Sequence, residues 1–426
     1  MEKPTRHSSL THWLDWLLSL HAQEIDLGLT RVREVGQRLR LLQPKAKVIT
    51  VAGTNGKGSS VAFLQSIYQA AGYGVGAYTS PHILRFNERI QINGAPVADS
   101  AIVEAFAEIE AARGTTKLTY FEFATLAGLW VFAQQPLDVI VLEVGLGGRL
   151  DAVNIVDADI ALVTAIDVDH IDWLGSDKNQ IALEKAGIMR AGKPAICSDP
   201  TVPQTLIDFA NQLPTSLSLL GRDFGFEKMP KNDQAWLFLA QNSPTLTLDN
   251  PSLSGEFQFQ NAAGVVAVVQ TLQAVLPVTP AQISQGLAQA KHPGRLQWLT
   301  IEGQEWLIDV AHNPQSSAVL GQYLASQTLH FDSVIFSALS DKDMLPMVKA
   351  IQPFASQWLI ADLKVPRATS LENLQKLLKT AGVTEQAVRG FESIAQAVKA
   401  ARLKSSRVLV WGSFITVAQA LAVLEQ

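Results

Sequence analysis

Residues 51–60 read VAGTNGKGSS, and a β-branched run at 48–51 (VITV) leads into them. The segment that follows, from 57 to 71, has the apolar spacing of a helix. A strand, a glycine-rich turn and a helix N-terminus in this order can surround an anion with backbone N–H groups. Lys57 adds a full positive charge, but Gly58 follows it where the usual G-x-x-x-x-G-K-[ST] loop has a hydroxyl residue. We therefore predict a phosphate-binding loop of unusual spacing rather than an ordinary strand–helix turn.

The composition is that of a globular chain long enough for two domains. Of its 426 residues 47% are hydrophobic, and a formal net charge of -5 does not favour a nucleic-acid or anionic-membrane partner. The single cysteine, Cys197, cannot form an intramolecular disulfide. The first twenty residues do not resemble a signal peptide, and the apolar windows elsewhere are too short to span a bilayer. We expect a cytoplasmic protein.

Alternating strand-like and helical segments predict an α/β fold in two parts. The runs 137–144 (LDVIVLEV) and 160–166 (IALVTAI) are almost wholly apolar, which is typical of parallel strands covered on both faces. A hinge-like segment, KHPGRLQ at 291–297, contains adjacent proline and glycine. We expect a first domain near 1–293 and a smaller Rossmann-like α/β domain near 294–426.

A different pattern interrupts the first domain between residues 199 and 260. Pro, Asn and Ser become frequent, and apolar and polar residues alternate over short stretches. We expect an antiparallel appendage with strands at 235–240, 245–248 and 256–259, followed by a helix from 261.

Polar residues follow several of the predicted strands. Glu143 ends the buried run of LEVGLGGRLDAVN (142–154), and a buried carboxylate needs a cation or a hydrogen-bond donor. Magnesium that bridges nucleotide phosphates fits this position, and an ion pair with Arg149 is the alternative. By their residues alone, His170 in TAIDVDHIDWLG (164–175) is a surface or structural histidine and Lys185 in EKAGI (184–188) an exposed helical lysine. Ser80 in TSPH is an ordinary turn residue.

Taken together, the motifs GTNGKGS and LEVGLGGRLDAVN resemble those of the Mur ligase superfamily. The Gly58 variant of the loop is similar to the folate branch, the folylpolyglutamate synthases and dihydrofolate synthases. The resemblance runs from about residue 20 to the C-terminus and implies a Mur-ligase-type P-loop domain followed by a Rossmann-like domain. It implies ATP contacts from nine residues: Thr54, Asn55, Gly56, Lys57, Gly58, Ser59, Asn261, Arg295 and Asp309.

The same resemblance assigns the metal and the catalytic groups. It implies a first Mg²⁺ held by Ser80 and Glu143 and a second held by His170. It also implies that Lys185 is carbamylated, giving an anion that supports the second ion, so that Lys57, Lys185 and His170 are catalytic. A free lysine beside a cation would repel it, which makes the modification electrostatically reasonable.

Three further segments resemble those that hold dihydropteroate in this family. They are IDLGLTRV, with Asp26, Leu27, Gly28 and Leu29; TYFE, with Thr119, Tyr120, Phe121 and Glu122; and LDA, with Leu150, Asp151 and Ala152. Aromatic stacking together with a carboxylate that accepts pterin N–H groups is chemically suitable. The resemblance also places the incoming glutamate near His312 and Ser413.

The activity that follows from the resemblance is ATP-dependent amide formation through an acyl phosphate, with release of ADP. We expect ATP, L-glutamate, dihydropteroate and tetrahydrofolate as partners, with no nucleic acid or membrane partner, and a monomer. Four alternatives stay open: a Mur ligase acting on a peptidoglycan precursor, a monofunctional folylpolyglutamate synthase, a plain P-loop phosphotransferase and a non-catalytic nucleotide-binding regulator.

Overall fold

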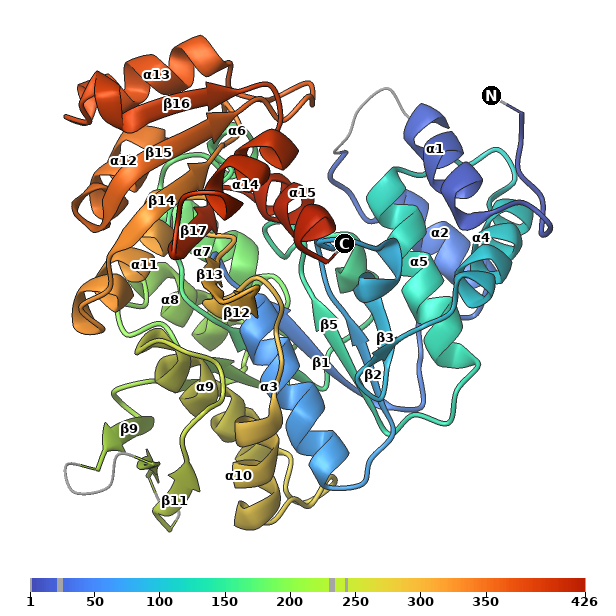
Figure 1. Cartoon of the computed structure of the whole chain (residues 1–426). Helices are drawn as coiled ribbons and strands as arrows, with labels where there is room; N and C mark the ends of the chain where they lie inside the picture. Colours follow the sequence, from blue (N-terminus) through green and yellow to red (C-terminus); the bar gives the residue numbers. More distant parts are fainter. Residues whose placement is uncertain (1, 21–25, 230–233, 242–243, 426) are drawn as a thin grey trace. The chain divides into compact units, whose positions relative to one another are not determined.

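The computed structural model describes residues 2–20, 26–229, 234–241 and 244–425 (Figure 1). The chain forms two compact units. The first extends to Lys291, apart from residues 83–85 and 253–257, which belong with residues 292–426 in the second. Each unit is described by itself.

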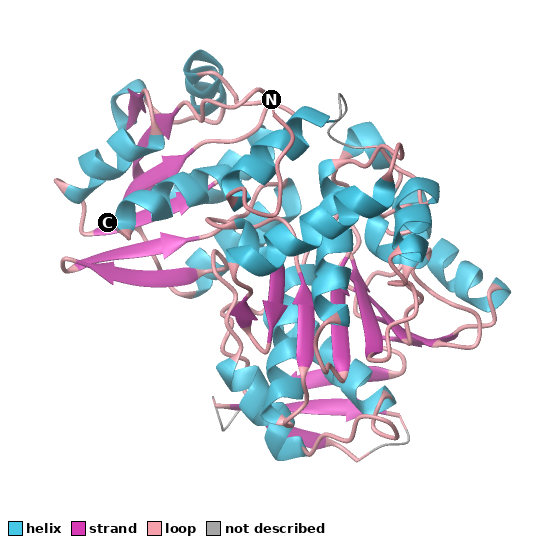
Figure 2. Ribbon diagram, turned by 90° about the vertical axis from the view of Figure 1, so that its right-hand side faces the viewer, coloured by secondary structure: helices cyan, strands magenta, loops and turns pink. Residues whose placement is uncertain are grey.

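An eight-stranded sheet organises the first unit, in the order β4-β3-β2-β5-β1-β6-β7-β8. Six of its strands are parallel, and β3 and β4 form an antiparallel edge. The parallel arrows are visible in Figure 2. The strands are β1 (Lys47–Ala52), β2 (Val75–Tyr78), β3 (Ile90–Ile92), β4 (Ala95–Pro96), β5 (Val139–Glu143), β6 (Ile160–Val163), β7 (Pro194–Cys197) and β8 (Ser216–Leu219).

Helices cover both faces of this sheet, as the apolar runs predict. One face packs, through residues such as Val48, Leu142 and Val163, against the apolar sides of α1, α2, α4, α5, α7 and α8. On the other face lie α3, which contacts β1, β2 and β5, and α9, whose Gly264 packs on Leu162. The helices are α1 (Leu10–Leu20), α2 (Thr30–Arg38), α3 (Lys57–Ala70), α4 (Asp99–Arg113), α5 (Tyr120–Ala133), α6 (Ile171–Leu174), α7 (Lys178–Ala186), α8 (Gln204–Gln212), α9 (Phe257–Thr271) and α10 (Pro280–Gln289).

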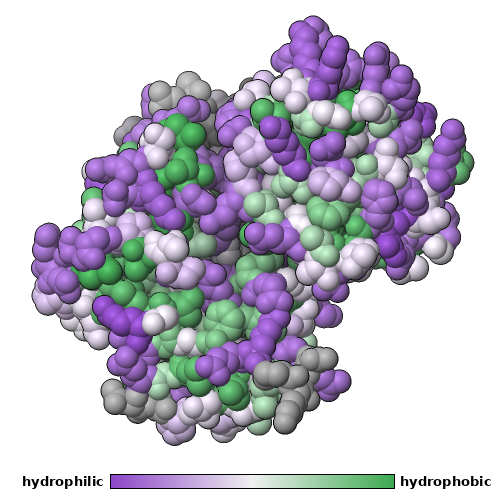
Figure 3. Space-filling model, turned by 90° about the vertical axis from the view of Figure 1, so that its left-hand side faces the viewer, coloured by the Kyte–Doolittle hydropathy of each residue, from purple (hydrophilic) through white to green (hydrophobic). Residues whose placement is uncertain are grey.

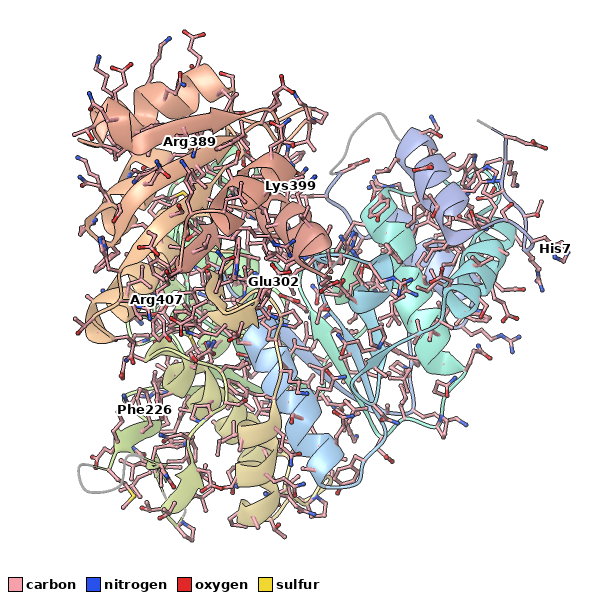
Figure 4. All side chains as sticks on the ribbon, viewed as in Figure 1. His7, Phe226, Glu302, Arg389, Lys399 and Arg407 are labelled. Atoms are coloured by element: carbon pink, nitrogen blue, oxygen red, sulfur yellow. The ribbon has the colours of Figure 1, made fainter. Side chains whose placement is uncertain are left out.

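The appendage is a three-stranded antiparallel sheet of β9 (Phe224–Lys228), β10 (Ala235–Ala240) and β11 (Leu246–Asp249). The strand expected at 256–259 is wrong, because helix α9 begins at Phe257. Polar and apolar residues alternate in Glu-Phe-Gln-Phe at 256–259, and this alternation is typical of a strand. Phe259 nevertheless stacks on Phe226 of β9, labelled in Figure 4, from within the helix.

The second unit has a six-stranded sheet in the order β12-β13-β17-β14-β15-β16. All neighbours are parallel except the hairpin of β12 and β13. Its strands are β12 (Gln297–Ile301), β13 (Gln304–Ile308), β14 (Phe331–Phe336), β15 (Ala355–Ala361), β16 (Val388–Phe391) and β17 (Arg407–Trp411), and its helices are α11 (Pro314–Ser326), α12 (Met344–Ile351), α13 (Leu371–Thr380), α14 (Ile394–Arg402) and α15 (Phe414–Leu424).

Two apolar layers enclose this second sheet. Leu307, Phe336 and Trp411 pack toward α11, α12 and α13, whereas Ile308 and Val410 pack toward α14 and α15. This is the doubly wound arrangement that the alternation of strands and helices predicts. Cross-strand partners reinforce it: Arg407, labelled in Figure 4, donates from Nε to Glu305 Oε2 at 2.8 Å.

The surface is mixed in polarity. On the face drawn in Figure 3, hydrophobic side chains are interspersed with hydrophilic ones. In the described part of the chain, no helix combines the length and the apolar character that a membrane span requires.

Candidate active site

The loop between β1 and α3 has a shape that depends on two glycines. Gly56 is the N-cap of α3 with φ 91°, a left-handed conformation that favours glycine, and no side chain caps the helix. A Cβ on Gly53 would lie 1.8 Å from Thr164 Oγ1, so any larger residue would displace the Thr164 side chain. The Thr164 hydroxyl donates to the Asn55 carbonyl at 2.8 Å, which ties the loop to the end of β6. The N-terminus of α3 therefore faces the loop without a side-chain cap.

Lys57 lies over this loop. Its ammonium donates to the carbonyls of Gly53 and Thr54 at 2.9 and 3.1 Å. Thr54 is held in turn by a reciprocal pair of hydrogen bonds between its hydroxyl and the backbone of Asp167. A cation, a helix N-terminus and a glycine turn thus meet at the carboxyl end of β1, where open α/β sheets bind ligands.

The carboxylate of Glu143 lies at the end of the neighbouring strand β5. It is 5% exposed, and its Oε2 accepts from the backbone N–H of Ser80 at 3.0 Å. The predicted approach of Ser80 and Glu143 is therefore present in the structure. The alternative pairing of Glu143 with Arg149 is wrong, because the Arg149 guanidinium donates to Glu184 at 2.7 and 3.0 Å.

The donor set at this point suits a nucleotide-bound divalent cation. In the described residues, no group of three or more His, Cys, Asp or Glu side chains is arranged to hold a metal ion. Mg²⁺ in nucleotide sites usually takes one or two protein oxygens and completes its shell with water and phosphates. Glu143 and the Ser80 hydroxyl match that requirement.

Lys185 is buried rather than exposed, contrary to the sequence-based interpretation. Only 3% of it is accessible, on α7. Burial, reinforced by the charge of Lys57, lowers the pKa of Lys185 to about 7. A large fraction of its amine is therefore neutral and nucleophilic near pH 7. His170, by contrast, is exposed at the start of α6, with φ 53°.

An arginine that the sequence interpretation did not single out joins two of the three predicted dihydropteroate segments. Arg31 pairs with Asp26 at 2.8 Å and with Glu122 at 3.2 Å. Glu122 also forms a capping box with Thr119, and burial raises the pKa of Glu122 above its ordinary value. The clue in the sequence is a basic residue in IDLGLTRV beside an acidic partner. Gly28 and Leu29 lie between Asp26 and Arg31, and Gly28 leaves open space where a Cβ would stand.

The third segment has a structural role for its carboxylate. Asp151 is buried, and its two oxygens accept from the N–H groups of Leu146 and Val153 at 2.8 and 3.0 Å. Burial raises the pKa of Asp151 to about 6. The loop that it shapes touches the second segment, since a Cβ on Gly145 would lie 2.6 Å from the Phe121 ring. Leu150 and Ala152 flank Asp151, so the TYFE and LDA segments are neighbours in the fold.

The sequence interpretation also did not single out Arg89, which lies beside Tyr120. Arg89 is buried, donates from Nε to His82 Nδ1 at 2.8 Å, and lies over the rings of Phe86 and Tyr120 at 5.6 and 5.8 Å. Burial, together with the charge of Arg89, lowers the pKa of His82 to about 4.

The pKa of His82 predicts a pH dependence of stability. Between about 4 and the ordinary 6.5, the unfolded chain binds a proton that the folded chain does not, so the free energy of unfolding rises with pH. The slope contributed by His82 is at most about 1.4 kcal/mol per pH unit. Urea titrations across this range should show a smaller rise in the His82→Phe variant. Parallel curves for both proteins between pH 4 and 6.5 would contradict the assignment.

In the second unit, two of the predicted residues, Arg295 and His312, lie against the ring of Phe414, which directly follows the predicted Ser413. The Arg295 guanidinium lies 5.3 Å from the Phe414 ring centroid, and the His312 ring lies 5.6 Å from it. Asp309, at the end of β13, accepts from the N–H groups of Leu296 and Ala311 at 2.9 and 2.7 Å. Burial raises the pKa of Asp309, against the opposing charge of Arg295. Ser413 caps α15.

Family models match most of the chain. The Mur ligase middle domain matches residues 51–269, and the Mur ligase glutamate ligase domain matches residues 294–414. A dihydrofolate synthase/folylpolyglutamate synthase of Escherichia coli is 42% identical over 426 residues, which cover 99% of this chain and 97% of the relative. The chain belongs to the dihydrofolate synthase/folylpolyglutamate synthase family of Mur ligases.

Solved structures agree with this family across both units. E. coli FolC in complex with DHPP and ADP has a TM-score of 0.91 and 41% identity, with 99% of each chain covered. A bifunctional folylpolyglutamate synthase/dihydrofolate synthase with Mn, AMPPNP and L-glutamate bound has a TM-score of 0.90 and 39% identity, with both chains covered completely. The predicted fold class, a Mur-ligase-type P-loop domain with a second α/β domain, is confirmed. The family's structures thus bind nucleotide and a divalent metal.

Proposed function

We propose that this chain is an ATP-dependent ligase that adds L-glutamate to dihydropteroate, forming dihydrofolate, and to the γ-carboxyl of tetrahydrofolate. The observation that carries the proposal is the meeting of Lys57, Ser80 and Glu143 at adjacent strand ends, in a chain similar over its whole length to bifunctional enzymes. That site can neutralise transferring phosphates, which is the main requirement of phosphoryl transfer.

The reaction has two steps. The substrate carboxylate attacks the γ-phosphorus of ATP, and the bond between the γ-phosphorus and the β–γ bridging oxygen breaks, giving an acyl phosphate and ADP. The α-amine of glutamate then attacks the acyl carbon, loses a proton, and expels phosphate. Lys57 and the N–H groups of the α3 N-terminus stabilise the phosphate charge, and Asn261 lies beside Gly56 to contact the nucleotide. Mg²⁺, held by Ser80 and Glu143 and in a second position by His170, would supply additional charge neutralisation.

The remaining roles belong to the same proposal and are those that the family resemblance implies. In the first unit, the segments joined by Arg31 and Phe121 hold the pterin. In the second, Arg295 and Asp309 contact ATP, and His312 and Ser413 bind glutamate near Phe414.

Mass spectrometry of the products tests the proposal. The protein is incubated with ATP, glutamate and either dihydropteroate or tetrahydrofolate, and a gain of one glutamyl unit on both substrates is expected. A gain on tetrahydrofolate alone would select a monofunctional folylpolyglutamate synthase. ADP release without glutamate would indicate a phosphotransferase, and nucleotide binding without any turnover would indicate a regulator.

Carbamylation of Lys185 is a separate part of the proposal. Its neutral amine attacks CO₂, forming an N–C bond and releasing one proton, and burial lowers the pKa of Lys185 enough to make this amine available. We expect kcat to fall severalfold in CO₂-depleted buffer at pH 6 and to recover on addition of bicarbonate. Native mass spectrometry should show the loss and return of one carboxyl group. Full activity with an unmodified Lys185 would contradict this role.

A further inference from the structure

The turn at 293–296, which carries Arg295, has an unusual backbone. Gly294 has φ 70°, a left-handed conformation that favours glycine, and Leu296 has φ 41°, which a leucine rarely adopts. The Leu296 side chain is 4% exposed and packs in the same apolar layer as Leu307. Left-handed residues of this kind persist only where the surrounding structure holds them. Because Arg295 lies between the two, the direction of its side chain depends on what holds the turn.

Hydrogen bonds hold this turn on both sides of the arginine. The Leu296 N–H donates to Asp309 Oδ2 at 2.9 Å. The Gly294 carbonyl accepts from the Val310 N–H at 2.9 Å. A further bond comes from a side chain that has no role in the proposed function, because the Gly294 N–H donates to Gln297 Oε1 at 2.8 Å. Residues at the end of β13 thus supply two of these bonds, and Gln297 supplies the third.

Gln297 is well placed to act on Gly294. It is the first residue of β12, where it pairs with Ile308 of β13, and its side chain reaches back three residues along the chain. A backbone N–H only donates, so the amide oxygen of Gln297, rather than its nitrogen, must face Gly294. Gly294 is buried. Removal of this oxygen would therefore leave the Gly294 N–H without its acceptor or force the turn to change.

The turn brings the arginine cation next to other groups of the second unit. The Arg295 guanidinium lies 5.3 Å from the Phe414 ring centroid. Burial raises the pKa of Asp309, and the charge of Arg295 opposes this rise. Arginine is long and loses much rotamer freedom when it is ordered, so it keeps one position more readily when its backbone is fixed. The turn is therefore suited to orient the guanidinium before a ligand binds.

We propose that Gln297 is a positioning residue that holds the Gly294 N–H and thereby orients Arg295 toward the nucleotide. The inference deepens the proposed function, since it rests on the contact of Arg295 with ATP. A guanidinium that is already oriented loses less conformational freedom on binding, so its contribution to nucleotide affinity is larger. Gln297 itself touches no substrate. Its effect on affinity therefore passes through Arg295 and should disappear when the guanidinium is removed.

Substitutions of Gln297 separate its acceptor from its size. Gln297→Met removes the acceptor at similar volume, and we expect the Kd for AMPPNP with Mg²⁺ to rise about tenfold. Gln297→Glu retains an acceptor oxygen for the Gly294 N–H, so its Kd should stay within about threefold of the wild-type value. In an Arg295→Met background the Kd should already be raised, and Gln297→Met should then change it by less than about twofold.

Gln304→Met is the matched control on the same hairpin. Gln304 is the first residue of β13, and its Nε2 donates to the carbonyls of Arg402 and Ser405 at 2.8 and 2.5 Å. The substitution removes hydrogen bonds of a half-buried glutamine without touching the turn before β12. We expect it to lower the melting temperature and to leave the AMPPNP affinity unchanged.

Titration calorimetry with AMPPNP and Mg²⁺ measures these affinities without ligase turnover. If the wild type binds AMPPNP but forms no glutamyl product, the proposed function fails, and the same affinities still decide the role of Gln297. Wild-type affinity in a folded Gln297→Met or Arg295→Met variant would overturn the positioning role, as would an equal loss on Gln297→Met in the Arg295→Met background. A Gln297→Glu variant as weak as Gln297→Met would also overturn it, because the acceptor would then not matter. If Gln297→Met does not fold, Gln297→Thr, whose hydroxyl is too short to reach Gly294, replaces it under the same criteria.

Discussion

We expect the Lys57→Met variant to lose both glutamate additions, with kcat lower by about 10³-fold or more, as is typical when a charge that stabilises phosphoryl transfer is removed. Lys57 is the only charged residue in GTNGKGS, and its ammonium lies directly over the loop, held by the Gly53 and Thr54 carbonyls. Methionine keeps most of the side-chain length and removes the charge. Coupled-enzyme measurement of ADP release, with each folate substrate in turn, gives kcat.

The interpretation requires that the variant is folded and that the effect belongs to this site. Lys376→Met is a matched control, because Lys376 is an exposed helical lysine paired with Glu372, and it should leave kcat unchanged. Lys57→Arg retains a charge and should recover part of the activity. Because the charge of Lys57 lowers the pKa of Lys185, carbamylation must be checked by mass in each variant. A folded Lys57→Met protein with kcat within tenfold of wild type would exclude this loop as the phosphate site.

The sequence predicts the fold best where the pattern of residues in a segment determines the structure of that same segment. As predicted, three apolar segments form neighbouring parallel strands of one sheet, which helices cover on both faces. These segments are the run before Gly53, the run that ends at Glu143 and the run that begins at residue 160. Parallel strands bring their carboxyl ends to one edge. The proximity of Ser80 to Glu143, which the family resemblance implied, agrees with this geometry.

Other parts depend on contacts that no local pattern records. Lys185 resembles an exposed helical lysine in sequence, yet the fold buries it, and burial decides its acid–base chemistry. Gln258 lies in an alternating segment that resembles a strand, so its i, i+3 relation to Asn261 is visible only once α9 begins at Phe257. Arg31 joins Asp26 to Glu122, which lies 91 residues after Arg31 in the sequence.

The largest effect on metal dependence is expected from Glu143→Gln. Glutamine keeps an oxygen to accept from the Ser80 N–H, so the strand ends should stay in place while the negative charge is lost. We expect the Mg²⁺ concentration that gives half-maximal activity to rise by at least about tenfold and kcat to fall by about a hundredfold, which is the typical size of effect when metal ligation is weakened. Activity measured across a Mg²⁺ series with saturating ATP tests both values.

Stability gives a second readout that does not depend on turnover. A carboxylate that is 5% exposed carries a desolvation cost, and a bound cation would offset it. Mg²⁺ with ADP should raise the melting temperature of the wild type, because binding to the folded state stabilises it, and should raise that of Glu143→Gln much less. Glu110→Gln is the matched control: Glu110 is a buried carboxylate on α4, paired with Lys3 and Arg113, and its loss should lower stability without changing the Mg²⁺ response. An equal Mg²⁺-dependent rise in Glu143→Gln and the wild type would mean that the cation binds elsewhere and that Glu143 has a purely structural role at the end of β5.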